Sequence, residues 1–201
     1  MESAYDLTAK YYDTALRPLE RLFLASARKE TIAFLPENAT ILEVGAGTGA
    51  NFQHYPKCRH SVASELSIGM LGKSLPKAAG ITLVQADAQL LPFPANHFDA
   101  AFATLVFCSI SEPALAFAEL IRVVRPGGRV ILLEHVRPSG ILGYVFDALS
   151  KMTVAMFDDH FNRRTAVAAE RAGLRVIEVR KKVFGIVNLI VTEVPVMSGE
   201  V

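Results

Sequence analysis

Residues Thr40–Gly49, with the sequence TILEVGAGTG, join a short apolar run to three closely spaced glycines, and this stretch decides the fold. The run Thr40–Val44 is rich in β-branched residues, which is typical of a buried strand. Gly45, Gly47 and Gly49 follow at once, and glycine lets the backbone adopt positive φ and approach a ligand without a Cβ in the way. The stretch therefore predicts a strand, a tight turn and a helix, with a ligand-binding site at the turn.

Downstream of the glycines, short β-rich runs alternate with helical patterns. The clearest helical pattern is Ser111–Val124, with Ser111 as its N-cap, Pro113 in its first turn and Pro126-Gly127-Gly128 ending it. Strands that alternate with helices predict a mostly parallel sheet covered on both faces. The strands predicted in this part of the chain are Thr40–Val44, His60–Ser64, Ile81–Gln85, Phe98–Thr104 and Arg129–His135.

The alternation changes after the fifth strand. Residues 140–157 form an apolar, helical pattern, and a further helix is predicted at Arg164–Ala172. Two β-rich stretches follow, Leu174–Val183 and Ile186–Val194. A parallel crossover needs a dozen or more residues, so two strands this close in sequence should form an antiparallel hairpin. We expect this hairpin at one end of the sheet.

Composition excludes several classes of protein. The chain has 201 residues, of which 51% are hydrophobic and 20% are charged, so we expect one domain with a full core and no extended disorder. The net charge of +1 argues against nucleic acid as a partner. Cys58 and Cys108 have no CxxC spacing, so neither a disulfide framework nor a zinc site is expected. With no apolar stretch of about 18 residues and no secretory leader visible, we expect a cytoplasmic protein.

Two downstream acids complete a predicted nucleoside site. Glu65 follows Gly45 by 20 residues, at the end of the second strand, where a carboxylate can accept both hydroxyls of a ribose. Asp87 ends the third strand, at the edge of the sheet where open α/β folds bind ligands. Either acid taken singly is typical of a solvated strand end, so the prediction depends on their spacing. Together with the glycines they outline a floor, a ribose clamp and an acceptor for the edge of a base.

The glycine spacing alone leaves two ligands open. Gly45-x-Gly47-x-x-Ala50 also fits the relaxed dinucleotide pattern, which makes an NAD-dependent oxidoreductase an alternative. Glu43, directly before the turn, is unfavourable beside a pyrophosphate but suits a cationic ligand. The sequence has no Tyr-x-x-x-Lys pair, and we expect no second domain to hold a hydride acceptor. A sulfonium nucleoside with an amino-acid tail, S-adenosylmethionine, fits these features better.

The combined pattern resembles the class I S-adenosylmethionine-dependent methyltransferases from Tyr5 to Glu193. Tyr5-Asp6 and Tyr11-Tyr12-Asp13 are similar to the quinone-biosynthesis and phospholipid N-methyltransferase branch. TLVFCSI, PGGRVILLEHV and FDDHFNR are similar to segments of the thiol methyltransferases. The motifs that carry the class resemblance are LEVGAGTG, the acid at position 65, QADAQLLPF, FDAAFATLVFCSI and ELIRVVRPGGRVILLEH.

The resemblance implies a three-layer, Rossmann-like α/β fold with a seven-stranded, mostly parallel sheet and an antiparallel C-terminal hairpin. It implies S-adenosylmethionine as cofactor, S-adenosylhomocysteine as product, and methyl transfer without a metal. It places the methionine part against the glycines, the ribose on Glu65, the adenine amino group on Asp87, and the methionine amino group near Glu43 through water. The implied cofactor-binding residues are Glu43, Gly45, Ala46, Gly47, Gly49, Glu65, Leu66, Asp87, Ala88, Thr104 and Leu105.

Methyl transfer mainly requires that donor and acceptor be aligned and shielded from water. The candidates for a catalytic role are Tyr11 and Tyr12, as a lid near the sulfonium, and His135, whose imidazole would titrate near neutral pH. Ordinary helix packing for the tyrosines and a structural role for His135 remain alternatives. The cluster Asp158-Asp159-His160 is a weaker candidate, and it lacks the second histidine that a metal site would need.

The acceptor is expected to be small or lipid-like. The stretch 140–157 is rich in large apolar side chains, and residues 160–182 carry seven Lys or Arg against two Glu. These features favour a lipophilic acceptor or peripheral contact with a membrane surface, although packing on the sheet and a solvated charged face would explain them equally well. A phosphatidylethanolamine-type amine comes first, followed by a hydrophobic thiol or a quinone-type ring. A non-catalytic nucleoside-binding module is the alternative of another class.

We expect a single methyltransferase domain over residues 1–201. Within it, residues 1–36 would form an N-terminal helical cap and residues 37–136 the cofactor-binding core. Residues 137–161 would form an insertion on the acceptor side, and residues 162–201 the last helix and the hairpin. The sequence makes no prediction of the oligomeric state.

Overall fold

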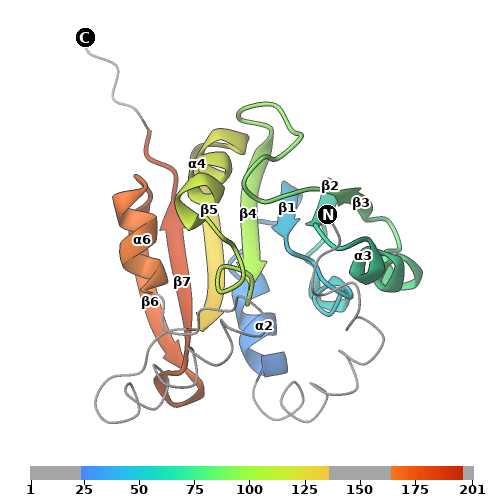
Figure 1. Ribbon diagram of the computed structural model, residues 1–201, viewed down its shortest axis with the longest axis horizontal. Helices are drawn as coiled ribbons and strands as arrows, with labels where there is room; N and C mark the ends of the chain where they lie inside the picture. The colour runs from blue at the N-terminus through green and yellow to red at the C-terminus, as the bar shows by residue number, and fades with distance from the viewer. Residues whose placement is uncertain (1–23, 136–163, 197–201) are drawn as a thin grey trace.

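The computed structural model describes residues 24–135 and 164–196, whose strands form one seven-stranded sheet in the order β3-β2-β1-β4-β5-β7-β6 (Figure 1). The first five strands run parallel to one another, and β7 runs antiparallel to both β5 and β6. This confirms the predicted α/β fold and its terminal hairpin. The strands are β1 (Thr40–Val44), β2 (His60–Glu65), β3 (Thr82–Gln85), β4 (Phe98–Thr104), β5 (Val124–His135), β6 (Arg175–Lys182) and β7 (Val187–Glu193).

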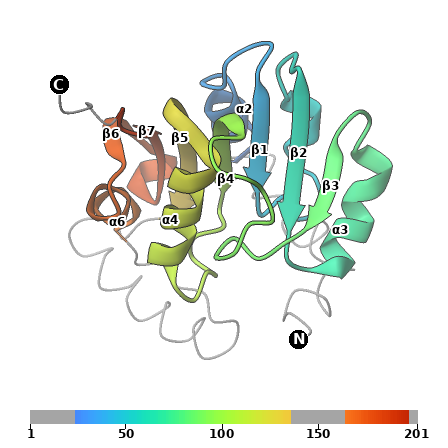
Figure 2. The ribbon, with the colours of Figure 1, turned by 90° about the horizontal axis from the view of Figure 1, so that it is seen from above.

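Helices cover both faces of the sheet, so the fold has three layers (Figure 2). Residues of α4 and α6 pack with Leu42, Val130 and Leu132 on one face, and residues of α2 pack with Ile41 and Leu133 on the other. The strand residues alternate between the two faces, as period-two burial requires. The helices are α2 (Ala25–Ile32), α3 (Ile68–Ser74), α4 (Pro113–Val123) and α6 (Thr165–Arg171), with 3₁₀ turns η2 (Phe52–His54), η3 (Leu75–Lys77) and η4 (Val183–Gly185).

The junction between α4 and β5 differs from the prediction. The N-cap of α4 is Glu112 and not Ser111, and its side chain makes no capping hydrogen bond. The segment Pro126-Gly127-Gly128 was expected to end the helix, but it lies inside β5, where the pairing with β4 shifts. Gly128 is required there, because a Cβ would lie 2.7 Å from the backbone oxygen of Asp99. The glycines therefore shape a bulge between two strands.

The order of the strands determines where a ligand can bind. Strands β2 and β3 lie on one side of β1, and the chain then crosses to the other side of β1, where β4 lies. In open α/β sheets ligands bind beside the carboxyl ends of the strands at such a reversal. The glycine turn follows β1 and lies at this point. Among the described residues, no helix is both long and apolar enough to cross a membrane. The expected tyrosine segment at 11–13, most of the N-terminal cap and the insertion at 137–161 lie outside the described residues.

Candidate functional site

The turn after β1 is built on two glycines with different constraints. Gly45 has a φ of +69°, and a Cβ there would lie 2.5 Å from a methyl group of Val106. Gly47 has a φ of +56°, but no protein atom lies within 4 Å of the place a Cβ would take. The turn thus packs tightly against the loop after β4 on one side, and exposes bare backbone to open space on the other. A ligand can therefore approach the backbone at Gly47.

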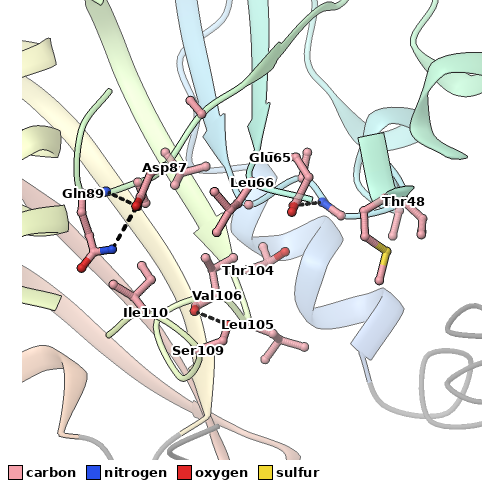
Figure 3. A pocket seen from close by; sticks show the side chains of 18 of the residues that line it. Thr48, Glu65, Leu66, Asp87, Gln89, Thr104, Leu105, Val106, Ser109 and Ile110 are labelled. Carbon is pink, nitrogen blue, oxygen red and sulfur yellow. Dashed lines mark hydrogen bonds between the residues drawn. The ribbon is translucent and has the colours of Figure 1, made fainter. Parts of the chain in front are cut away.

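A cavity of about 300 Å³ lies over this turn, within the size range of small-molecule sites (Figure 3). Its lining includes nine of the eleven residues expected to hold a cofactor: Gly45, Ala46, Gly47, Glu65, Leu66, Asp87, Ala88, Thr104 and Leu105. Glu43 and Gly49 do not line it, nor does His135. The described lining also includes residues that were not expected, among them Arg28, Met70, Gln89, Val106, Ser109 and Ile110.

Glu65 ties the glycine turn to the start of α3. One carboxylate oxygen accepts a hydrogen bond from the backbone N–H of Gly47 at 2.8 Å, and the other accepts one from Ser67 at 2.9 Å. Glu65 also lines the cavity, so the carboxylate that supports the turn borders the space where a ligand would lie.

Asp87 lies on the opposite wall, directly after β3 (Figure 3). Its Oδ1 accepts a hydrogen bond from the backbone N–H of Gln89 at 2.8 Å. The side-chain amide of Gln89 also donates to both of its oxygens. Glu65 and Asp87, 22 positions apart in the sequence, thus face a single cavity across the ends of neighbouring strands. Their spacing indicated this arrangement, since parallel neighbours end at one edge of a sheet.

Arg28 supplies a buried cation to the cavity wall. It is 9% exposed, and its Nη1 donates to Oγ1 of Thr104 at 2.5 Å and contacts Oδ1 of Asn51 at 3.4 Å. Sequence reasoning placed it only within a helix. A signal was present, because Arg28 interrupts the buried stripe formed by Leu24, Ala27, Thr31 and Ile32. A lone arginine on an apolar helical face indicates a specific polar partner.

Glu43 is fully buried behind the cavity wall and not in it. Its Oε1 accepts from the side-chain amide of Asn51 at 2.5 Å, and its Oε2 accepts from the hydroxyl of Tyr55. Burial raises the pKa of the Glu43 carboxyl, opposed by these two hydrogen bonds and by the charge of Arg28. The same Asn51 amide donates to Thr104 at 2.8 Å. Glu43 is therefore connected through Asn51 to Thr104, which lines the cavity.

His135 ends β5 beside Arg28 and outside the cavity lining. Burial, with a smaller contribution from the charge of Arg28, lowers the pKa of the imidazole to about 4. The expectation that it titrates near neutral pH is therefore wrong, because a charged imidazole is disfavoured both by desolvation and by its cationic neighbour. Tyr11, Tyr12 and the cluster at 158–160 lie outside the described residues. Within the part that is described, no three acids, histidines or cysteines are grouped to hold a metal.

Comparison with known proteins extends these observations. Residues 42–132 match the family model described as a methyltransferase domain. A demethylmenaquinone methyltransferase of Renibacterium salmoninarum is 35% identical over 100 residues, which is 49% of this chain and 42% of that protein. The ubiquinone/menaquinone biosynthesis C-methyltransferase UbiE of Azotobacter vinelandii is 42% identical over 74 residues, 36% of this chain and 29% of the relative. The matched stretch thus spans less than half the length of these curated relatives.

Solved structures share the fold over nearly the whole chain. The complex of the Haloferax volcanii Trm112 methyltransferase activator with a methyltransferase matches with a TM-score of 0.78 and 16% identity, covering 97% of this chain and 99% of the other. A methyltransferase from Thermotoga maritima matches with a TM-score of 0.74 and 18% identity, covering 94% and 97%. At this identity the likeness establishes the three-layer architecture, terminal hairpin included.

Proposed function

We propose that the protein is a class I S-adenosylmethionine-dependent methyltransferase that transfers a methyl group to a small acceptor, with a quinone-type ring the leading candidate. The match of residues 42–132 to a methyltransferase domain and the shared fold support this proposal. The observation that carries this proposal is the single cavity over the glycine turn. It brings together Gly47, Glu65 and Asp87 from the ends of three different strands. If the glycines served only to pack the turn, neither Glu65 nor Asp87 would need to face it.

The residues of the cavity fit the parts of this cofactor. The bare backbone at Gly47 leaves room for the ligand chain, and Glu65, at the end of β2 in the cavity lining, would accept hydrogen bonds from the ribose hydroxyls. Asp87 would accept a hydrogen bond from the adenine amino group, and the backbone of Ala88 would lie beside the adenine. Arg28, held on Thr104, would pair with the methionine carboxylate, since a buried guanidinium is best satisfied by a carboxylate. When bound, the cofactor supplies a methyl group made electrophilic by the sulfonium.

The protein's own contribution is alignment and the exclusion of water. The apolar side chains of Leu105, Val106 and Ile110 line the cavity where the loop after β4 covers it. Among the described lining residues, the ionisable side chains are Arg28, Glu65 and Asp87, and the proposal assigns each of them to the cofactor. Tyr11 and Tyr12 stay our candidates for a lid near the sulfonium, and His135 stays a candidate for taking a proton from the acceptor. With a pKa of about 4, His135 is neutral at pH 7 but a weak base, and it lies outside the cavity lining.

We place a quinone-type ring ahead of a thiol and of a phosphatidylethanolamine-type amine. The two relatives described above are named for methylation in menaquinone or ubiquinone biosynthesis, and neither name refers to a phospholipid. All three acceptors are lipophilic, so the apolar stretch expected on the acceptor side is compatible with each. The order rests on the relatives alone.

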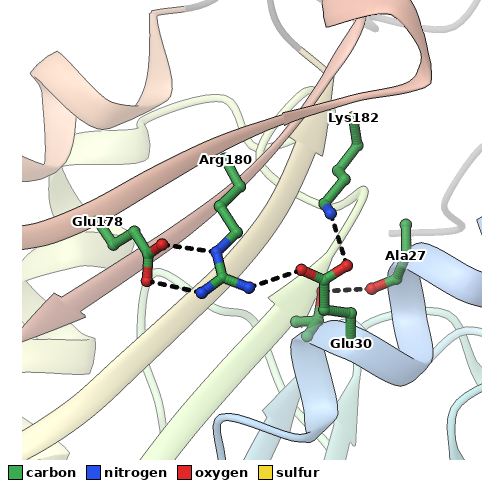
Figure 4. A network of polar contacts seen from close by, with 6 residues as sticks. Ala27, Glu30, Glu178, Arg180 and Lys182 are labelled. Carbon is green, nitrogen blue, oxygen red and sulfur yellow. Dashed lines mark hydrogen bonds and ion pairs between the residues drawn. The ribbon is translucent and has the colours of Figure 1, made fainter.

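Peripheral membrane contact receives little support from the basic stretch that suggested it. Arg175 pairs with Glu193, and Arg180 pairs with both Glu178 and Glu30 (Figure 4). Lys182 also pairs with Glu30. Several of the cations are thus neutralised within the fold, which leaves less positive charge for anionic lipid. Sedimentation with anionic vesicles at low salt tests the contact, and a protein that stays in the supernatant excludes it.

Isothermal titration calorimetry with S-adenosylhomocysteine tests the cofactor assignment. We expect saturable binding of this product and none of NAD; the opposite result would favour the oxidoreductase alternative. An acceptor screen then compares a demethylated quinol, a hydrophobic thiol and phosphatidylethanolamine vesicles, with methylated product detected by mass spectrometry. Cofactor binding without product from any acceptor class would favour a non-catalytic module.

The variant Glu65→Ala should weaken S-adenosylhomocysteine binding about ten-fold or more, because charge-assisted bonds to the ribose are lost. Glu37→Ala, at an exposed site before β1, is the control and should leave the affinity unchanged. Calorimetry on both variants gives the comparison. An unaltered affinity in Glu65→Ala would remove this carboxylate from the ligand site.

A further inference from the structure

The side chain of Gln89 joins two walls of the cavity. Its Nε2 donates to Oδ1 of Asp87 at 3.1 Å and to Oδ2 at 3.2 Å (Figure 3). Its Oε1 accepts a hydrogen bond from the backbone N–H of Glu112 at 2.9 Å. Asp87 follows β3, whereas Glu112 directly precedes α4, and Gln89 and Glu112 are 23 residues apart along the chain. One amide group therefore connects the expected adenine-binding loop to the loop that covers the cavity.

The orientation of this amide is dictated at both ends. A carboxylate accepts hydrogen bonds and cannot donate them, so the NH₂ group must face Asp87. A backbone N–H only donates, so the carbonyl oxygen must face Glu112. Exchanging the two groups would place acceptor against acceptor and donor against donor. Glutamine is suited to both neighbours, whereas neither glutamate nor leucine is.

The contacts also determine which part of Asp87 remains available. A carboxylate offers about four acceptor positions. The backbone N–H and the side chain of Gln89 occupy both positions on Oδ1 and one on Oδ2. The remaining position, on Oδ2, is the one left for a ligand. A half-buried aspartate without these donors would populate several rotamers and present either oxygen.

We propose that Gln89 is a positioning residue that orients Asp87 to recognise the amino group of adenine. This inference rests on the proposed function, because it takes the ligand to be an adenosine sulfonium or its product. Gln89 acts through Asp87 and determines selectivity for the base. Removing its side chain should therefore affect the choice between adenine and a base without an amino group, in addition to overall affinity.

The test compares S-adenosylhomocysteine with S-inosylhomocysteine, in which a carbonyl oxygen replaces the amino group. By calorimetry we expect the wild-type protein to prefer the adenine compound about ten-fold or more, since a carboxylate facing a carbonyl oxygen is left unpaired. Gln89→Leu should reduce this preference to about three-fold or less. Gln53→Leu is the matched control, because the amide of Gln53 is exposed and, within the described part of the chain, bonds only to the backbone of Ala50. It should keep the wild-type preference.

A second variant separates the contribution of the Gln89 amide nitrogen from that of its carbonyl oxygen. Gln89→Glu retains an acceptor for Glu112 but places a second carboxyl against Asp87, and such a pair must share a proton. At pH 5 the shared proton restores the donor, so binding of S-adenosylhomocysteine should lie within about three-fold of wild type. At pH 8 it should be about ten-fold weaker. Other charged groups lie on the elements around this loop, and the wild-type protein measured at both pH values controls for them; they are Glu65, Glu112, Glu119 and Arg122.

The outcomes are distinguishable. If the wild-type protein binds neither compound, the proposed function fails and this inference falls with it. If the wild-type protein discriminates between the compounds and Gln89→Leu does so equally well, the proposed function stands and the role of Gln89 is wrong. The role of Gln89 is also wrong if Gln89→Leu weakens the binding of both compounds equally. The same holds if S-adenosylhomocysteine binding by Gln89→Glu does not depend on pH. Thermal melting of each variant identifies any that fails to fold, and the remaining variant then decides.

Discussion

Gly45 and Gly47 share one turn, but substitution should affect them in different ways. Gly45→Ala places a Cβ 2.5 Å from Val106 at a φ of +69°, so it should lower the free energy of unfolding by about 3 kcal/mol through overpacking and backbone strain. Gly47→Ala should cost about 1 kcal/mol, because its Cβ meets only open space at a φ of +56°. That Cβ nevertheless projects over the turn where the ligand would lie. Gly47→Ala should therefore weaken S-adenosylhomocysteine binding out of proportion to its stability loss.

Urea unfolding and calorimetry on the two variants measure both effects. The double variant Gly45→Ala/Val106→Ala removes the methyl groups that the new Cβ would strike, and should recover part of the stability lost by Gly45→Ala. Equal stability losses in the two single variants would contradict the difference in packing described for this turn.

His135 should make the protein sensitive to acid. Its pKa falls from an ordinary 6.5 to about 4 in the folded protein, so below pH 6.5 the unfolded chain takes up a proton that the folded one refuses. The stability present above pH 6.5 is therefore lost as the pH falls toward 4, by about 3 kcal/mol at most. We expect His135→Asn to lose less stability than wild type over this window in urea unfolding. His60→Asn, at an exposed histidine, should follow wild type.

Some residues of the site could be predicted from the sequence and others could not. The spacing of Glu65 and Asp87 predicted that both would lie beside the glycine turn, because parallel strands place their carboxyl ends at one edge. Arg28 and Gln89 were not found, because their importance arises from contacts with Thr104, Asp87 and the backbone before α4. Such contacts depend on how distant segments pack. No local pattern in the sequence records them.

At the scale of elements, α2 is joined to the C-terminal hairpin by a cluster of charges (Figure 4). Glu30 pairs with Arg180 at 2.9 Å and with Lys182 at 2.6 Å, and these cations lower the pKa of the Glu30 carboxyl. The guanidinium of Arg180 also lies 4.9 Å from the centre of the Phe34 ring. Because α2 carries Arg28 to the cavity, this cluster helps to hold one wall of the site.

Glu30→Gln should lower the free energy of unfolding by about 1 kcal/mol or less, since these side chains are partly exposed. The loss should shrink at about 1 M salt, where such pairs are screened. Glu178→Gln is the control, because it removes a pair within β6 and leaves α2 bonded to the hairpin. Urea unfolding at both salt concentrations measures the difference; a salt-independent loss would show that the charges are not its cause.

The loop after β4 is an element that packing shapes more than local sequence. Leu105 adopts a φ of +60°, and its backbone N–H bonds to Leu133 at 2.7 Å. The next two backbone N–H groups, of Val106 and Phe107, donate to the buried carboxylate of Glu134. A leucine in the left-handed region is not predictable from propensity, because it is tolerated only where the surroundings stabilise it. The same holds for the bulge in β5, which the sequence suggested only as the end of a helix.

At the scale of the whole molecule, the predicted fold class, strand sequence and terminal hairpin are confirmed. They were predictable because apolar β-rich runs, helical spacing and the short link between β6 and β7 are all local properties. The family resemblance implied seven strands, and their order across the sheet came from the structure. Shifts in register and the partners of buried polar groups were not predictable, since they reflect the packing of several elements at once.

Ligand binding should stabilise the molecule as a unit. S-adenosylhomocysteine at about 100 times its dissociation constant should raise the free energy of unfolding by about 2.7 kcal/mol, because it binds only the folded state. NAD at the same concentration should have no effect. Differential scanning fluorimetry measures both, with a rise in melting temperature expected for the first alone. A shift with NAD and none with the homocysteine compound would reject the cofactor assignment.

The antiparallel insertion of β7 between β5 and β6 has a consequence for how the protein is made. Ala27 and Ile32 of α2 pack with Leu189 and Val191, which are synthesised more than 150 residues later. A nascent chain that has emerged only as far as His135 carries the glycine turn and both acids, but lacks this part of the surface on which α2 packs. The wall bearing Arg28 therefore gains its full support only after β7 has been synthesised.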